Sequence, residues 1–160
     1  EFRRVLFRSL LFTGHSHQAW PDIAREGQLE YFDICARDVD KKWEVSFEKT
    51  EILRNYLRDY YDDPDGFYCR EESTHFLMVS LMSSFDLKNK PKIITTDSEF
   101  HSMFRQLRRL EEEGLEVVRV PINPDADFAT RIIEEIDVDT SAIMLSRVYF
   151  ESSQIGRAHV

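Results

Sequence analysis

The chain has 160 residues and a formal net charge of −9, from 21 basic and 30 acidic side chains. This balance argues against nonspecific binding to nucleic acid and against binding to an anionic membrane, since both need clustered lysines and arginines. No apolar run approaches the about 20 residues of a membrane-spanning helix. Two cysteines without C-x-x-C spacing, Cys35 and Cys69, argue against a disulfide framework or zinc cluster and favour a reducing, cytoplasmic location.

The two ends of the chain, Glu1–Ser9 and Ile155–Val160, correspond to translated sequencing-library adapter, and we treat them as artefacts. Setting aside these nine and six residues leaves 145, from Leu10 to Gln154. The ends hold four arginines and one glutamate, so the net charge of the remainder falls from −9 to −12. We expect this remainder to be a fragment that is cut at both ends.

Residues 10–66 are predicted to be an N-terminal helical segment. Pro21 followed by Asp22 is typical of a helix start, and apolar residues at partly helical spacing continue the helix to about Cys35. Residues 38–46 are predicted to form a loop. The second predicted helix has apolar residues at positions i, i+1, i+4, i+5 and i+8, namely Ile52, Leu53, Tyr56, Leu57 and Tyr60.

Residues 67–154 alternate between strand and helix patterns after a turn at 62–66. The expected order is a β-prone run at Phe67–Cys69, a mostly buried helix from Ser73 through Phe85, a strand at Ile93–Thr95, a helix at Phe100–Glu113 ended by Gly114, a strand at Glu116–Val120, a helix over Phe128–Ile136 and a strand at Ala142–Leu145. This alternation predicts βαβ units and a parallel sheet, hence an α/β fold. A three-layer α/β fold normally has more strands, so we interpret 67–154 as the first half of a larger domain.

Two junctions between an extended segment and a helix are candidate ligand sites, Thr95–Ser102 and Glu72–His75. The first N–H groups of a helix are unpaired and lie at the positive end of its dipole, so they favour anions. Ser73 and Thr74 could therefore cap the helix or hold a phosphate. Phe100 could pack in the core or stack on a flat heteroaromatic ring. For isolated residues, capping and packing are the commoner roles.

Histidine and acidic side chains leave two other functions open. His15, His17, Asp97 and His101 could serve a metal-dependent hydrolase. Their spacing matches neither a helical i, i+4 histidine pair nor a known zinc pattern, so the sequence predicts no metal site. The other alternative is a non-catalytic α/β interaction domain, in which the residues of both junctions only cap and pack.

Three stretches together resemble class V aminotransferase-fold enzymes, which bind pyridoxal 5′-phosphate (PLP). Thr96–Ser102, followed by Arg105–Glu111, resembles their cofactor-ring segment, and Ser73–Thr74 resembles their phosphate-binding hydroxyls at a helix start. Val148–Gln154 resembles the V-x-Y-x-T/S-G-Q stretch of kynureninases. Order and distance along the chain agree with the family, and His15–His17 lies where it has an amino-terminal active-site loop.

The resemblance implies the first half of the large domain of a fold type I PLP-dependent transferase, a three-layer α/β fold with a parallel-rich sheet. The cofactor-binding residues it implies are Ser73 and Thr74 for the phosphate, Phe100 for stacking on the ring and Ser102 for support, and the substrate-facing residues are His15, His17 and His101. The substrate would be an amino acid, transaminated or cleaved at a β- or γ-carbon bond. The parent protein would be a homodimer.

Two departures from family motifs refine this resemblance. Cysteine desulfurases have a histidine at the position of Phe100, so the phenylalanine favours the kynureninase-like branch. His101 and Met103 replace the proline and aspartate of the kynureninase motif F-P-S/T-D.

The residues that perform PLP chemistry are missing from this chain. PLP enzymes need a lysine that binds the cofactor and an acid that keeps the ring nitrogen protonated. All six lysines lie in polar or loop-like contexts, whereas a reactive lysine needs a shielded site. In the family both groups come later, so we expect them beyond Gln154 and predict that this chain holds no catalytic residue and is inactive.

Overall fold

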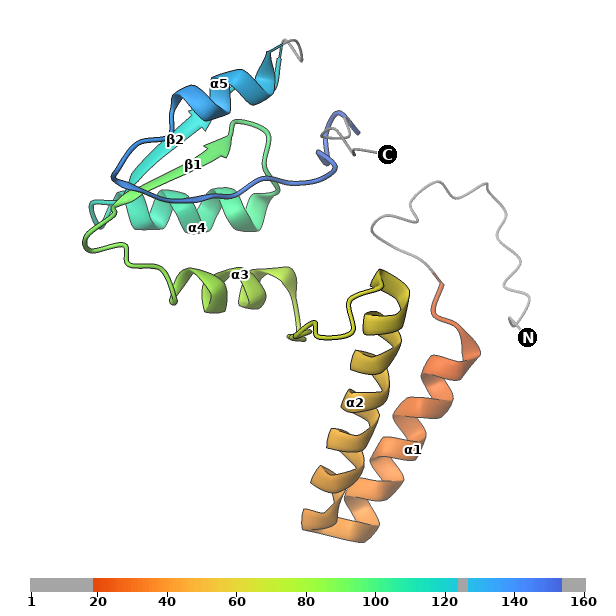
Figure 1. The fold of residues 1–160 in the computed structure, drawn as a ribbon. Helices are drawn as coiled ribbons and strands as arrows, with labels where there is room; N and C mark the ends of the chain where they lie inside the picture. The colour runs from red at the N-terminus through yellow and green to blue at the C-terminus, as the bar shows by residue number, and fades with distance from the viewer. Residues whose placement is uncertain (1–18, 124–126, 154–160) are drawn as a thin grey trace. The chain divides into compact units, whose positions relative to one another are not determined.

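The computed structural model describes residues 19–123 and 127–153 (Figure 1). The chain divides into two compact units, one up to Tyr68 and one from Cys69. The first unit is helical and the second is mixed α/β. None of the helices in the described ranges combines the length and the apolarity that crossing a membrane requires.

The helical unit consists of two α-helices with almost no loop between them. α1 spans Asp22–Asp38, the short 3-10 helix η1 spans Val39–Lys41, and α2 spans Lys42–Tyr61. Pro21 precedes α1 as predicted, but the predicted loop at 38–46 is wrong, because only η1 separates the helices. Residues 42–46 contain neither glycine nor proline, so nothing local prevents them from forming the first turns of α2.

Little of this unit is buried. Ile34 is its only buried residue among those that the structure describes. The apolar stripe of α2 falls within the helix as predicted, yet Ile52, Tyr56 and Tyr60 are exposed.

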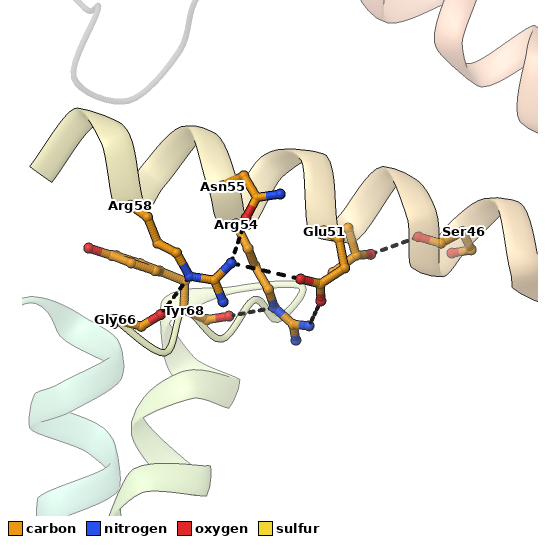
Figure 2. Close-up of polar contacts among 8 residues, drawn as sticks. Ser46, Glu51, Arg54, Asn55, Arg58, Gly66 and Tyr68 are labelled. Atoms are coloured by element: carbon orange, nitrogen blue, oxygen red, sulfur yellow. Dashed lines mark hydrogen bonds and ion pairs between the residues drawn. The ribbon is translucent and has the colours of Figure 1, made fainter. Parts of the chain in front are cut away.

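The segment after α2 is held against that helix by two arginines (Figure 2). The Nε–H of Arg54 donates to the carbonyl of Tyr68 at 3.0 Å, and that of Arg58 donates to the carbonyl of Gly66 at 3.0 Å. The β-prone run Phe67–Cys69 is therefore not a strand, and this prediction is wrong. Guanidinium groups bind the carbonyls of this segment, and no described strand pairs with it.

The α/β unit is built on a three-stranded parallel sheet in the order β2-β1-β3. Its elements are α3 (Thr74–Met82), β1 (Lys92–Thr96), α4 (His101–Glu111), β2 (Glu116–Val120), α5 (Phe128–Glu134) and β3 (Thr140–Ile143). The prediction of an α/β fold with a parallel sheet is confirmed, and β2 has the predicted bounds. Gly114, with φ +103°, follows α4 as predicted, whereas α5 ends two residues before Ile136.

Helices cover both faces of the sheet. Successive side chains of a strand point to opposite faces. Ile93 packs with Leu107 of α4 and with Met78 and Met82 of α3, whereas Ile94 packs on the other face with Ile132 of α5. Both isoleucines of β1 are fully buried. Figure 1 shows the same arrangement, with α4 and α5 on opposite sides of β1 and β2.

α3 is less buried than predicted. Met78 and Met82 face the core, but Phe76, Leu77, Val79 and Leu81 are each more than a third exposed. α3 is apolar on all sides, and only the side that meets the sheet and α4 has a packing partner in the described unit. The prediction of a mostly buried helix is therefore wrong here.

Candidate functional site

The carboxyl end of β1 is the point at which the chain reverses its direction across the sheet. From β1 the chain passes through α4 to β2 on one side, and then through α5 to β3 on the other side of β1. In doubly wound α/β sheets, ligands bind outside the carboxyl ends of the strands at such a reversal. The predicted ligand junction Thr95–Ser102 begins at this point.

Glu99 links the two strands that flank the reversal. Its Oε1 accepts hydrogen bonds from Thr96 Oγ1 at 2.8 Å and from the Ser146 backbone N–H at 3.1 Å, and its Oε2 accepts one from Ser146 Oγ. Thr96 ends β1, and Ser146 follows β3 by three residues. The carboxylate is buried, with the residue 8 % exposed. A charge at this depth is tolerated because hydrogen bonds satisfy both oxygens.

Tyr149 closes the same region from the segment that follows β3. It is 2 % exposed, and its phenol lies near the Thr96 side chain. Burial raises the pKa of the phenol, so Tyr149 stays protonated and neutral at neutral pH.

Three aromatic rings gather on the exposed side of this network. Phe100, the residue before α4, meets Phe150 edge-on, with centroids 5.3 Å apart and planes at 88°. His101 lies 5.2 Å from the Phe150 ring and 5.5 Å from the Phe100 ring. Phe100 is 49 % exposed and Phe150 44 %. Phe100 is therefore not a core residue among the described residues, and part of its surface is open to a ligand.

The other predicted junction forms the start of α3. Ser73 caps the helix, and its Oγ accepts from the Phe76 N–H at 3.4 Å. Ser73 and Thr74 are both exposed. His75 Nδ1 is buried and has no hydrogen-bond partner. Capping is thus confirmed for Ser73, and a long capping bond leaves its hydroxyl able to make a second contact.

α3 and α4 present their amino termini at one end of the α/β unit. The helices pack on each other, and Figure 1 shows both running in the same direction, beginning at the end toward which β1 points. The structure therefore brings Ser73 and Thr74 to the same end of the unit as Phe100. Ser102 is half-buried in the first turn of α4.

The residues proposed for metal binding are only partly described. His15 and His17 lie outside the described residues. Asp97 Oδ1 accepts from the Ile122 N–H at 3.2 Å and from Ser98 Oγ at 2.9 Å, so this carboxylate joins β1 to the segment after β2. Within 19–123 and 127–153, no group of three or more histidine, cysteine, aspartate or glutamate side chains could hold a metal ion.

The buried lysine of the α/β unit lies at the other end of the sheet from the candidate site. Lys92 is the only buried one, and it lies at the amino end of β1, opposite the reversal. Its Nζ donates to Asp137 Oδ2 at 2.8 Å and to the Glu135 carbonyl at 2.6 Å. The hydrogen bond to Asp137 raises the pKa of Lys92, although burial opposes this. A nucleophilic amine needs the opposite shift, so Lys92 is unsuited to bind a carbonyl cofactor covalently.

Four residues of this region were not predicted as site residues from the sequence. They are Glu99, Ser146, Tyr149 and Phe150. A glutamate placed just after an apolar strand was a usable signal, but its partner lies 47 positions later in the sequence. Only the pairing of β1 with β3 shows that these segments meet.

Ser153 has a φ of +56°, in the left-handed region that favours glycine. It stands where the V-x-Y-x-T/S-G-Q stretch has its glycine when Val148 is aligned with the valine.

Comparison of this chain with protein-family models, with curated proteins and with solved structures finds no match.

Proposed function

We propose that this chain carries the phosphate-holding and ring-stacking side of a PLP site, in a kynureninase-like enzyme of the class V aminotransferase family that acts on an amino acid. The observation that carries the proposal is the position of Phe100. It is a half-exposed aromatic residue at the carboxyl end of the central strand, where the chain reverses across the sheet. Flat cofactors bind at this position in open α/β sheets.

The start of α3 fits the phosphate of such a cofactor. Two exposed hydroxyls, the first unpaired N–H groups and the positive end of the helix dipole converge there. Ser73 and Thr74 would thus hold the phosphate.

The ring side of the site is aromatic. Phe100 would stack on the pyridine ring, and Ser102 would support it from the first turn of α4. His101 would face the substrate, as would His15 and His17. When bound, PLP supplies an electron sink for the bonds around the amino-acid α-carbon. The side chains described here bind and orient, and none of them is placed to form the covalent bond to the cofactor.

The segment after β3 gives independent support. The positive φ of Ser153 falls where the kynureninase stretch has glycine. That agreement concerns backbone shape, and the resemblance itself rests on residue types. The covalent lysine and the ring-nitrogen aspartate would lie beyond Gln154, in a parent enzyme that is a cytoplasmic homodimer.

Binding of pyridoxamine 5′-phosphate to the 160-residue chain tests the proposal. This probe has no aldehyde and cannot react with surface lysines, and pyridoxamine serves as the matched ligand without phosphate. We expect Ser73→Ala/Thr74→Ala to weaken binding of the phosphorylated probe about tenfold, as the loss of charge-assisted hydrogen bonds does. Binding of pyridoxamine should not change. Ser83→Ala, at the other end of α3, is the control.

Phe100→Ala tests the ring side with the same probes. It should weaken both ligands by a similar factor, about tenfold, because stacking does not depend on the phosphate. Equal dissociation constants for wild type and all variants, measured by equilibrium dialysis, would overturn the proposal. Loss of fold in Phe100→Ala without any ligand effect would instead favour the interaction-domain alternative.

A further inference from the structure

We infer that Glu99 is a positioning residue whose buried carboxylate holds Phe100 and Phe150 together as one aromatic wall. The wall is defined here as these two rings. The clamp is defined as the hydrogen bonds of the Glu99 carboxylate to Thr96 and Ser146. That the wall faces the cofactor ring depends on the proposed function, whereas the clamp does not.

The carboxylate of Glu99 binds groups on two separate segments of the chain. It accepts three hydrogen bonds, from Thr96 Oγ1, the Ser146 N–H and Ser146 Oγ. Thr96 Oγ1 in turn accepts from the Ser98 N–H at 3.3 Å, so the turn between β1 and α4 is fixed by the same network. This buried carboxylate has both oxygens occupied. It is well suited to fix geometry.

The segment that carries Phe150 is attached at two points. Ser146 is bonded to Glu99, and Tyr149 is buried beside the Thr96 side chain. The Ser153 N–H donates to the Tyr149 carbonyl at 2.8 Å, which folds the chain into a turn after Phe150. Phe150 follows the second attachment directly, so its backbone has little freedom.

Phe100 is attached to the other side of the same clamp, because it follows Glu99 in the sequence. The two rings therefore meet across a carboxylate that joins both of their segments. Their edge-on contact at 5.3 Å fixes the orientation of each ring. Without the clamp, only this ring contact, the burial of Tyr149 and the bonds of Met144 to β1 would hold the two segments together.

The test compares Glu99→Ala with Glu99→Gln in the full chain. Glutamine keeps one oxygen for Thr96 Oγ1 and the Ser146 N–H, and the Ser146 hydroxyl can rotate to accept from the new amide. We expect Glu99→Ala to abolish the nuclear Overhauser effect between the Phe100 and Phe150 rings and to speed hydrogen exchange of the Ser146 amide at least tenfold. Glu99→Gln should retain both signals. Glu134→Gln, on the exposed end of α5, is the control.

Each outcome decides the inference. An unchanged ring contact in Glu99→Ala overturns it, and so does loss of the contact in Glu99→Gln, because that would assign the role to the charge. If Glu99→Ala does not fold, Ser146→Ala removes one of the three bonds only. It should at least halve the ring contact while far-ultraviolet circular dichroism stays unchanged, and an unweakened contact again overturns the clamp.

Ligand binding separates this inference from the proposed function. Glu99→Ala should weaken pyridoxamine 5′-phosphate and pyridoxamine alike, by about the factor seen for Phe100→Ala, and Glu99→Gln should restore both. If the wild-type chain binds neither probe, the proposed function is refuted. The nuclear Overhauser effect between the two rings still tests the clamp in that case. Binding that is unaffected in Glu99→Ala refutes the role of the wall and leaves the proposed function standing.

Discussion

The two units of this chain bury their apolar residues very differently. In the α/β unit, Ile93, Ile94 and Leu107 have no exposed surface, whereas the helical unit buries Ile34 alone among its described residues. A strand between helical layers gives partners to apolar residues on both faces. Two packed helices share only one contact face, so apolar residues elsewhere on them have no partner in the pair. The periodicity of apolar residues therefore predicts which side chains share a face, and burial depends on what covers that face.

Aromatic residues in the helical unit partly compensate by packing along their own helix. Trp43 stacks on Phe47 with centroids 6.4 Å apart, and Tyr56 stacks on Tyr60 at 6.1 Å. Both pairs have i, i+4 spacing, which places side chains one above the other on a helix. Such pairs stabilise a helix by only a few tenths of a kcal/mol, about 0.2–0.5 each, so they do not replace a core.

The largest expected contrast comes from removing one isoleucine side chain from each unit. Ile93→Ala should lower the free energy of unfolding by about 2–5 kcal/mol, because it leaves a cavity between the sheet and two helices. Ile52→Ala should change it by less than about 0.5 kcal/mol. Both tryptophans, Trp20 and Trp43, lie in the helical unit, so their fluorescence in urea reports on that unit. Hydrogen exchange of β1 reports on the other. Equal losses of unfolding free energy in Ile93→Ala and Ile52→Ala would contradict this prediction.

The ends of α1 and α4 offer a second contrast. α4 is followed by Gly114 at φ +103°, whereas α1 is followed by Val39 at φ +42°, which a β-branched residue rarely adopts. Left-handed backbone costs a residue with a side chain about 1–2 kcal/mol. Gly114→Ala should therefore destabilise the α/β unit by about 1 kcal/mol. Val39→Gly should stabilise the helical unit by up to about that amount, read from urea midpoints, and a loss in that variant would contradict it.

Ser153→Gly should give a smaller gain, because the segment after β3 is exposed at this residue. Relief of the positive φ should add about 0.5–1 kcal/mol, reduced by the extra freedom of glycine in the unfolded chain. Thermal unfolding followed by circular dichroism measures it, with Ser152→Gly as the matched control. A gain in the control, or none in Ser153→Gly, would contradict the backbone argument.

The smallest effect is expected from pH. The hydrogen bond between Lys92 and Asp137 raises the pKa of the lysine and lowers that of the aspartate. The aspartate contribution is present above the unfolded pKa, about 3.9, and is lost as pH falls through the lower folded value. The lysine contribution is present below about 10.4 and is lost as pH rises through the higher folded value. Solvent screening keeps the effect small, since Asp137 is 49 % exposed.

Lys92→Met should therefore flatten the stability profile at both ends of this pH window. Urea midpoints between pH 2 and 11 measure the profile. The control is Lys49→Met, whose partner Glu30 forms an ion pair exposed on both sides. A Lys92→Met profile parallel to that of wild type would exclude the pair as the cause.

Local sequence signals were sufficient for the strands and helices of the α/β unit. The β-branched run at Glu116–Val120 and the glycine after α4 determined these elements. The loop predicted at 38–46 failed because no breaker residue supports it, and the strand predicted at Phe67–Cys69 failed because two arginines bind the carbonyls of the segment. The absence of a breaker could be read from the sequence, whereas the arginine contacts involve backbone partners, which composition does not reveal.

The candidate site was only half visible in the sequence. Phe100 and the Ser73 cap follow from local pattern, because each lies beside a helix start. Glu99 acquires its role from Ser146, which is distant in the sequence and close only through the order of the strands. Contacts of this kind require the sheet, so a single sequence could not predict them.

The central position of β1 has a consequence for how the chain is made. Lys92 pairs with Glu116 on one side and with Thr140 on the other, so β1, which comes first of the three described strands, receives its second neighbour about twice as far along the chain as its first. Until β3 leaves the ribosome, one edge of β1, the most buried of the three described strands, stays unpaired, and long-range parallel pairing forms slowly. The chain is therefore most prone to aggregate after β2 has been synthesised and before β3 has been.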